Sequence, residues 1–327
     1  MTKSELRKSY FQSKDFKKNL NPIVIITIII LLAYSVSMLF PLWMALNASF
    51  KHEMDYRSTE IFLSMTKLPD VSFWEKYPLK NYDNVFGNYI SAFAKTTVRF
   101  GKKYYVGWNL DIVQGNPRTY QFYEFVINTL MYCAGSSVVP MLASLIVAYL
   151  AANYNYKFSG ILYGFVIFTM TTPMVGNAAT MINFLRRIMF YDNMLLHFVR
   201  AFSYPTMYFL IFYGYFKGLS GTYAEAADID GASQFRIMVQ IYFPLCFTMM
   251  GTAVLIDFVN AWNAYEVALL WLPNYPTIAF AVWQVAKRED GPKKFALLMT
   301  LAIPIVIIFI FTKDKLMGNL TLGGIKE

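Results

Sequence analysis

The chain has 327 residues, of which 57% are hydrophobic and only 15% are charged. Several apolar runs approach the roughly 20 residues that a helix needs to cross the hydrocarbon core of a bilayer. This composition excludes an ordinary soluble domain and predicts an all-α polytopic membrane protein. The basic residues behind the net charge of +9 flank the apolar runs. We therefore attribute the charge to topology and anionic lipid headgroups, and we expect no nucleic-acid partner.

Six transmembrane helices are expected. The first covers 23–46, and the other five lie within 122–312, near 122–152, from 160 onward, and near 198–216, 246–270 and 295–311. Between the first and second spans, residues 47–121 form a large extracytoplasmic loop. This loop is too rich in aromatic residues to be disordered, so it should fold as a cap.

Both termini are expected in the cytoplasm. Residues 1–22 carry six basic and two acidic side chains, which favours an inside location. An even number of spans then returns the tail, 313–327, to the same side. Several basic residues contradict this orientation because they would lie outside: Arg186, Arg187, Lys287, Arg288, Lys293 and Lys294. The N-terminal cluster and the number of spans decide the orientation.

A polar, acidic segment interrupts the apolar runs at 217–245. Thr222 and Glu225 have the S/T-x-x-E spacing of a capping box, so a helix should begin at Thr222. The small side chains of Ala226 and Ala227 would let another protein approach this helix closely. The segment therefore predicts a helix that contacts a partner in water.

A turn and a second short helix should follow. Asp230-Gly231 predicts the turn, because glycine adopts positive φ without steric cost. The second helix would run from about Ser233 to Pro244, where proline cannot supply a backbone N–H.

Polar residues recur every three positions along the fifth span, at Asp257, Asn260, Asn263 and Glu266. Polar side chains at membrane depth usually face the interior of a helix bundle. They could line a path for a hydroxylated solute, or they could form hydrogen bonds that hold the helices together. The sequence leaves both interpretations open.

The third span contains helix-breaking residues at Thr172, Pro173, Gly176 and Asn177. Such interruptions occur in membranes only against protein or a water-filled cavity. They are consistent with a solute path that opens and closes, and equally with a simple kink.

No catalytic or metal site is expected. The phosphate-binding pattern G-x-x-x-x-G-K-[ST] does not occur, so the chain should not hydrolyse ATP itself. His52 and His197 lie in unrelated segments without zinc-ligand spacing, and we interpret them as surface groups. Cys133 and Cys246 lie in or beside spans and indicate no disulfide framework.

The polar segment resembles a known signature. Glu225-Ala226-Ala227, Gly231 and, after nine more residues, Ile241 with Phe243-Pro244 are similar to the E-A-A-x3-G-x9-I-x-L-P motif of ABC importer permeases. Only Phe243 departs from it, where leucine is usual. Further stretches resemble the maltose-type permease subunit of the carbohydrate-uptake branch: Pro41-Leu42-Trp43, Asn81-Tyr82, residues 125–130, Ala261-Trp262-Asn263, and Gly318 with residues 322–326.

The resemblance implies a subunit that couples ATP hydrolysis on a separate protein to alternating access in the bacterial cytoplasmic membrane. Its partners would be a second homologous permease, two ATPase subunits that hold ATP and Mg, an extracytoplasmic solute-binding protein and membrane lipid. It assigns the ATPase contact to a coupling helix and its exit: Glu225, Ala226, Ala227, Asp228, Asp230, Gly231 and Pro244.

The resemblance also suggests that the loop before the last span contacts the solute-binding protein, through Trp271, Asn274, Tyr275 and Gln284. The simpler alternative is an ordinary connection. A sugar or oligosaccharide is the implied solute, although a non-sugar solute is also compatible with the motif. A proton-driven secondary transporter that uses Asp257 and Glu266 is the competing class.

Overall fold

The computed structural model describes residues 22–58, 66–76, 86–89, 98–100, 103–106, 111–114, 118–154, 157–172, 178–202, 207–219, 221–287 and 290–320. The predicted N-terminal segment lies outside these residues except for Pro22. The chain divides into two compact units. One contains Met1–Ser91 and Asp290–Met299, and the other contains Ala92–Glu289 and Thr300–Glu327.

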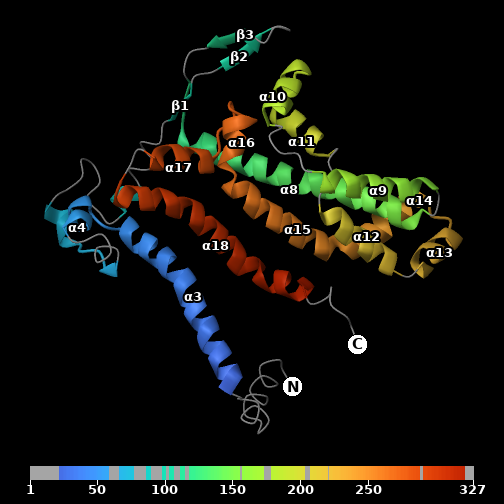
Figure 1. Cartoon of the computed structure of the whole chain (residues 1–327), viewed down its shortest axis with the longest axis horizontal. Coiled ribbons are helices and arrows are strands. Elements are labelled where there is room, and N and C mark those ends of the chain that lie inside the picture. The colour runs from blue at the N-terminus through green and yellow to red at the C-terminus, as the bar shows by residue number, and fades with distance from the viewer. Residues whose placement is uncertain are drawn as a thin grey trace. The chain divides into compact units, whose positions relative to one another are not determined.

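The first unit begins with a long apolar helix, α3, Pro22–Ser49 (Figure 1). Its side chains are exposed from Pro22 to Trp43, as expected for a helix surrounded by lipid. Two short helices follow, α4 Glu53–Arg57 and α6 Ser72–Lys76. The predicted surface position of His52 is wrong, because its ring is buried and Nδ1 accepts a hydrogen bond from the Met54 N–H at 3.2 Å.

The described residues of the predicted loop 47–121 include four short strands. Strand β1 Val98–Phe100 pairs antiparallel with β4 Arg118–Tyr120, and β2 Lys103–Val106 pairs antiparallel with β3 Asp111–Gln114. β-branched and aromatic residues are frequent in these segments and favour extended backbone. The helical class is right for the membrane segments, whereas these two strand pairs were not predicted.

Helix α8, Phe122–Asn153, is the centre of the second unit. Five other helices pack against it: α9 Lys157–Thr171, α11 Met194–Phe202, α12 Tyr208–Gly218, α15 Phe243–Asn263 and α17 Ile278–Ala286 (Figure 1). The other described helices are α10 Ala178–Arg187, α13 Thr222–Ile229, α14 Gln234–Ile237, the π-helix η1 Met238–Tyr242, α16 Tyr265–Leu270 and α18 Pro292–Leu320, of which α18 is divided between the two units at Met299.

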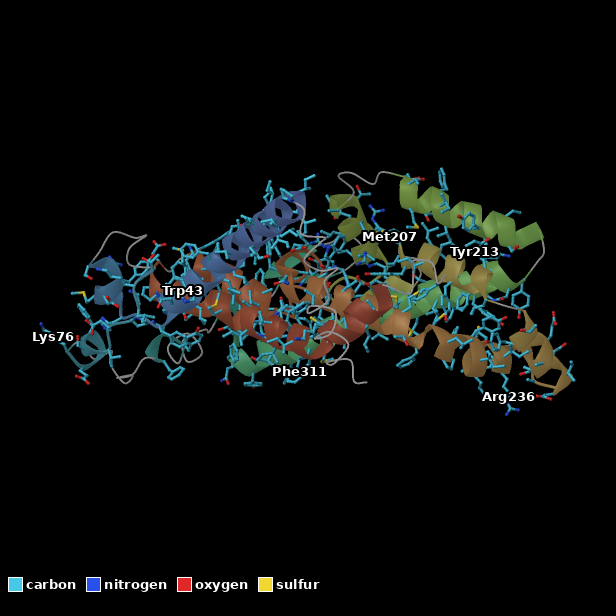
Figure 2. All side chains as sticks on the ribbon, turned by 90° about the horizontal axis from the view of Figure 1, so that it is seen from below. Trp43, Lys76, Met207, Tyr213, Arg236 and Phe311 are labelled. Atoms are coloured by element: carbon cyan, nitrogen blue, oxygen red, sulfur yellow. The ribbon has the colours of Figure 1, made fainter. Side chains whose placement is uncertain are left out.

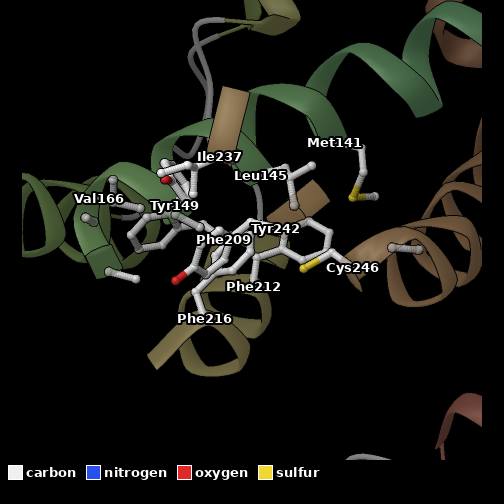
Figure 3. Close-up of a cluster of buried hydrophobic side chains, with 14 of the residues drawn as sticks. Met141, Leu145, Tyr149, Val166, Phe209, Phe212, Phe216, Ile237, Tyr242 and Cys246 are labelled. Atoms are coloured by element: carbon white, nitrogen blue, oxygen red, sulfur yellow. The ribbon is translucent and has the colours of Figure 1, made fainter. Parts of the chain in front are cut away.

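Aromatic rings from three helical segments form the core of the second unit (Figure 3). The Tyr149 ring of α8 meets the Phe216 ring of α12 at 5.7 Å and the Tyr242 ring of η1 at 5.1 Å, both edge to face. Phe216 and Tyr242 also contact each other, at 5.9 Å. Edge-to-face pairs place a positive ring edge on a negative ring face, so this triangle fixes the three segments relative to one another.

Four of the described helices are long and apolar enough to cross a membrane: Pro22–Ser49, Phe122–Asn153, Gln234–Asn263 and Pro292–Lys313. The predicted third span corresponds to the shorter α9. The predicted fourth span, 198–216, is divided between α11 and α12. The fifth begins before its predicted start at 246, and Ala264 separates α15 from α16.

Candidate functional site

The polar segment between α12 and α15 folds as an elbow, which we define as residues 221–242. Its first helix, α13, begins at the predicted residue, but the predicted capping box is wrong. The N-cap is Gly221, and no side-chain hydrogen bond caps the helix. Instead the Gly221 carbonyl accepts the N–H groups of Ala224 and Glu225, both at 3.0 Å. The bond from Glu225 is the first regular bond of the helix, and the bond from Ala224 satisfies one of the otherwise free donors of its first turn.

The predicted glycine turn is confirmed. Gly231 has φ of 74°, in the left-handed region that side chains rarely adopt. Its N–H bonds to the Asp228 carbonyl at 3.0 Å, and the Ala232 N–H bonds to the Ala227 carbonyl at 2.9 Å. This pair of bonds is a Schellman motif, which ends a helix and sends the chain off at a fixed angle.

The second helix of the elbow starts as predicted and ends differently. Ser233 is the N-cap of α14, and its hydroxyl accepts the Arg236 N–H at 3.4 Å. The predicted stop at Pro244 is wrong, since the helix continues into α15. The Phe243 N–H donates to Met238, five residues back, so the π-helix shifts the hydrogen-bond register immediately before the proline. Pro244 then falls in the first turn of α15, directly after this shift in register.

The elbow is anchored on one side and open on the other. Ala227 and Ile237 are buried and join the aromatic core of the second unit. On the open side, Ile229 is 87% exposed and Phe235 is 71% exposed, and the Tyr223 ring is also exposed. Large apolar side chains in a polar segment indicate a protein-contact surface. Sequence reasoning missed these three, although their apolar character within a polar segment was a usable signal.

The predicted coupling residues lie on the open side with few exceptions. Glu225, Ala226, Asp228, Asp230 and Gly231 are exposed. Ala227 is buried instead and contributes to the anchor. Pro244 is exposed in the first turn of α15. The side chain of Arg236 also stands out from the elbow (Figure 2), and its Nε donates to Gln240 Oε1 at 2.8 Å.

The polar residues predicted on the fifth span do not form a single row. Asp257 Oδ1 accepts the Tyr208 hydroxyl of α12 at 3.2 Å. Asn263 donates to the Val259 carbonyl of its own helix at 3.0 Å, and Glu266 lies beyond the break, exposed on α16. A spacing of three residues turns about the helix axis, which is why the side chains diverge.

Asn260 lines a cavity of about 350 Å³ between α15 and α18. Apart from Asn260 and Thr312, the lining side chains are apolar: Leu255, Ile256, Val259, Ile305, Val306, Ile308 and Phe309. The Thr312 hydroxyl donates to its own helix at Ile308, at 2.8 Å. Such a lining offers few hydrogen-bond partners to a hydroxylated solute. Within this chain, the cavity alone does not make a sugar site.

The predicted break in the third span is described only in part. Helix α9 ends at Thr171, and the Thr172 hydroxyl donates back to the Phe168 carbonyl at 2.7 Å. Pro173, Gly176 and Asn177 lie outside the described residues. Their proposed role in a solute path therefore remains a prediction.

Hydrogen bonds to Asp192 hold the loop at 271–277, which was predicted to contact a solute-binding protein. The Asp192 N–H donates to the Trp271 carbonyl at 3.2 Å, and its carboxylate accepts both the backbone N–H of Asn274, at 2.9 Å, and the Asn274 side-chain amide. Asp192 has φ of 57°, a left-handed conformation that its neighbours must stabilise. The Arg200 guanidinium stacks over the Trp271 ring at 5.0 Å.

Strand β4 and helix α8 hold the same loop from another direction. The Tyr120 hydroxyl donates to the Asn274 carbonyl and the Asn128 amide donates to the Pro276 carbonyl, both at 3.2 Å. The Ile278 N–H donates to the Thr129 hydroxyl at 2.8 Å. Tyr275 and Gln284, the other predicted contacts, are partly buried. The loop is a fixed turn and not a free extension.

The elbow lies within a region of the chain that matches a known protein family. Residues 141–313, more than half of the chain, match the family described as "Binding-protein-dependent transport system inner membrane component". The diacetylchitobiose uptake system permease protein NgcG of Streptomyces coelicolor is 24% identical over 90% of this chain and 86% of its own length.

Two further relatives cover less of the chain. The sulfoquinovosyl glycerol transport system permease protein SmoH of Agrobacterium fabrum is 24% identical over 62% of this chain and 73% of its own length. The arabinooligosaccharides transport system permease protein AraQ of Bacillus subtilis is 23% identical over 68% of this chain and 83% of its own length.

A solved chain shares the fold. It comes from a bacterial ABC transporter involved in the import of the acidic polysaccharide alginate. The TM-score is 0.68 at 16% identity, with 93% of this chain and 98% of that chain covered. From the family match and the geometry of the elbow, the chain belongs to the family of binding-protein-dependent transport system inner membrane components.

Proposed function

We propose that this protein is a permease subunit of a binding-protein-dependent ABC importer for a sugar or oligosaccharide. It would lie in the bacterial cytoplasmic membrane with six spans and both termini inside. A second homologous permease, two ATPase subunits and an extracytoplasmic solute-binding protein would complete the transporter. ATP and Mg would bind to the ATPase subunits, and this chain would carry no catalytic residue.

The observation that carries the proposal is the two-sided elbow. Its open side presents Glu225 beside exposed apolar side chains, and the glycine turn at Gly231 fixes the angle between its two helices. Its other side enters the aromatic core through Ala227 and Ile237. A partner that moves the open side therefore also moves the helices packed around α8.

Two hydrogen bonds extend this coupling along the membrane helices. The Tyr215 hydroxyl of α12 donates to the Leu245 carbonyl of α15 at 3.0 Å, and Tyr208 donates to Asp257 farther along the same two helices. Since α12 precedes the elbow and α15 follows it, these bonds join both of its ends. Closure of the ATPase pair would then displace α12 and α15 together and change which side of the membrane the solute path faces.

The solute path is proposed to run beside α15. Asp257 and Tyr208 would offer hydrogen bonds to solute hydroxyl groups, with Asn260, Asn263 and Glu266 as further candidates. The segment Thr172–Asn177 would border the path. The fixed turn carrying Trp271, Asn274 and Tyr275, with Gln284 on α17, would receive the solute-binding protein.

The relatives support a glycoside as the solute. These relatives are named for the transport or uptake of sulfoquinovosyl glycerol, arabinooligosaccharides and diacetylchitobiose. A sugar or oligosaccharide is therefore favoured over a non-sugar solute.

Co-purification tests the proposal. The chain would be co-expressed with the ATPase and the second permease, and the amount of ATPase retained after purification would be measured. Glu225→Lys and Gly231→Pro should each abolish retention. Glu75→Lys makes the same charge change at an exposed position of α6 and should leave ATPase retention intact. An ATPase that stays bound to both elbow variants contradicts the proposed contact.

A further inference from the structure

Helix α3 leads directly into a small folded segment, which we call the α3 cap: residues 50–58, 66–76 and 86–89. The helix remains exposed and apolar up to its last turns, and Trp43 is 42% exposed near the end that carries the cap (Figure 2). Tryptophan at the end of an apolar span is typical of the membrane–water interface. The level of Trp43 therefore marks the bilayer surface on α3.

Side-chain hydrogen bonds lock the cap onto the last turn of α3. The Asn47 amide donates to the Lys67 carbonyl at 2.5 Å. The Asn88 amide donates to the carbonyls of Ser49, at 2.9 Å, and Lys51, at 2.7 Å. These bonds join segments 20 to 39 residues apart in the sequence. The cap therefore has a fixed position relative to the end of the helix.

A buried ion pair strengthens the attachment. Lys51 is only 1% exposed, and its Nζ lies 3.6 Å from Asp55 Oδ2. The same carboxylate oxygen accepts the Asp70 N–H at 3.3 Å, so α4 is tied to the segment that leads into α6. Hydrogen bonds from the Ser72 side chain and N–H keep the pKa of Asp70 below its usual value. Polar contacts therefore hold the cap together, and those of Asn88 and Lys51 are buried.

Four apolar side chains of the cap are exposed instead, although one of them, Phe86, also meets the Phe50 ring edge to face at 5.7 Å. Leu68 is 77% exposed, and Met54, Val71 and Phe86 are also largely exposed. Leu68 is next to Lys67, whose carbonyl accepts the hydrogen bond from Asn47. Asn47 lies about one helical turn beyond Trp43 on α3. One turn rises about 5.4 Å. Leu68 is therefore close to the membrane level that Trp43 marks.

We propose that the α3 cap docks on the phospholipid bilayer, with Leu68, Val71, Met54 and Phe86 inserted at the interface. The exposed Lys67 beside Leu68 can reach a lipid phosphate while its carbon chain covers apolar surface. On α4, Glu53 and Arg57 pair at 2.8 Å and stay exposed beside Met54, which gives this short helix a polar and an apolar side.

The charges of the cap also fit a lipid surface. Its exposed ionic side chains are balanced in sign: Glu53, Arg57, Lys67, Asp70, Glu75 and Lys76. A balanced set offers no strong complementarity to an acidic or basic protein partner, whereas it is compatible with zwitterionic headgroups. The proposal requires only that α3 crosses the membrane, so it stands or fails separately from the proposed transport function.

Fluorescence quenching in proteoliposomes tests the docking. The full chain, carrying Cys133→Ala and Cys246→Ala, would receive one cysteine with an environment-sensitive label at Leu68 or, in a second variant, at Val71. Matched controls would carry the label at Val36, in the middle of α3, or at Glu75, on a charged position of the cap.

The two cap labels should lose fluorescence in lipids brominated near the headgroup and lose less in lipids brominated at the end of the acyl chain. The Val36 label should show the reverse order, and the Glu75 label should respond mainly to aqueous iodide. Iodide quenching at Leu68 and Val71 equal to that at Glu75 overturns the proposal. Shielding of both labels from lipid and iodide also overturns it, because a protein would then cover the surface.

Discussion

The Tyr208 hydroxyl donates to the Asp257 carboxylate at 3.2 Å and joins α12 to α15 within the helical core. A carboxylate in a membrane helix is costly unless it faces polar groups. Asp257 is partly exposed, so its remaining oxygen lone pairs can face water or a solute. The pair thus connects the two helices that flank the elbow. It also leaves a carboxylate on α15 that can accept further hydrogen bonds.

Removing the Tyr208 hydroxyl should weaken this connection. Tyr208→Phe deletes a hydrogen bond to a charged group, a change that typically costs about 1.5–3 kcal/mol. We expect a lower thermal unfolding temperature and less solute imported per ATP hydrolysed. Tyr265→Phe is the matched control, because it removes the hydroxyl of an exposed tyrosine on α16. Equal effects of both variants would show that the Tyr208 bond has no special role.

Close packing of α11 on α8 depends on Gly135. A Cβ added there would lie 2.2 Å from Phe198 Cζ, far inside van der Waals contact. Gly135→Ala should therefore destabilise the protein by about 1–3 kcal/mol, as overpacking does elsewhere. Thermal unfolding in detergent measures this. Gly164→Ala, where nothing lies within 4 Å, should have little effect.

A double variant tests the cause of that loss. Phe198→Ala removes the ring that a Cβ at position 135 would strike. Adding Gly135→Ala to Phe198→Ala should cost much less than adding it to the native chain, which is the non-additivity expected of residues in contact. Additive losses would place the defect elsewhere.

The turn at Gly231 should be sensitive to any side chain. Gly231→Ala has ample space but keeps φ at 74°, so its cost is conformational, about 1–2 kcal/mol. We expect weaker binding of the ATPase, measured as its dissociation constant. Gly221→Ala should bind normally, because Gly221 has φ of −61°. Normal binding by Gly231→Ala would mean that the angle of the elbow does not matter.

Asp192 should control the mobility of the turn at 271–277. Asp192→Ala removes the carboxylate that accepts two N–H groups of Asn274. It also places alanine at a position with left-handed backbone conformation, which aspartate and asparagine adopt more readily. Amide hydrogen exchange of 271–277 should accelerate, and the solute-binding protein should bind less tightly. Asp192→Asn, which tolerates the backbone conformation, should be less severe. Unchanged exchange in Asp192→Ala would contradict this role for the carboxylate.

The local features of the elbow were largely predictable from the sequence, since they depend on neighbouring residues. The start of α13, the turn at Gly231 and the N-cap at Ser233 all follow from short-range backbone chemistry. The continuation through Pro244 was not predictable, because the π-helix that accommodates it depends on packing of Tyr242 in the core. The Thr222 capping pattern failed because the Gly221 carbonyl already accepts the same donors.

Long-range contacts set the rest of the candidate site. Asn274 looked like part of an open loop, but its partner Asp192 lies 82 residues away. Likewise, the three-residue spacing on α15 did not predict the partner of each polar residue. Asp257 bonds with Tyr208, 49 residues away, whereas Asn260 lines an apolar cavity. No periodic pattern along one helix contains that information.

The central claim is that ATP hydrolysis on a partner moves solute through this chain by way of the elbow. It is tested by uptake of a radiolabelled glycoside, one bound by the solute-binding protein, into liposomes that contain the assembled transporter. We predict uptake that requires ATP and the binding protein and is lost in Glu225→Lys. Uptake by this chain alone, driven by a pH gradient without ATP, would contradict the account.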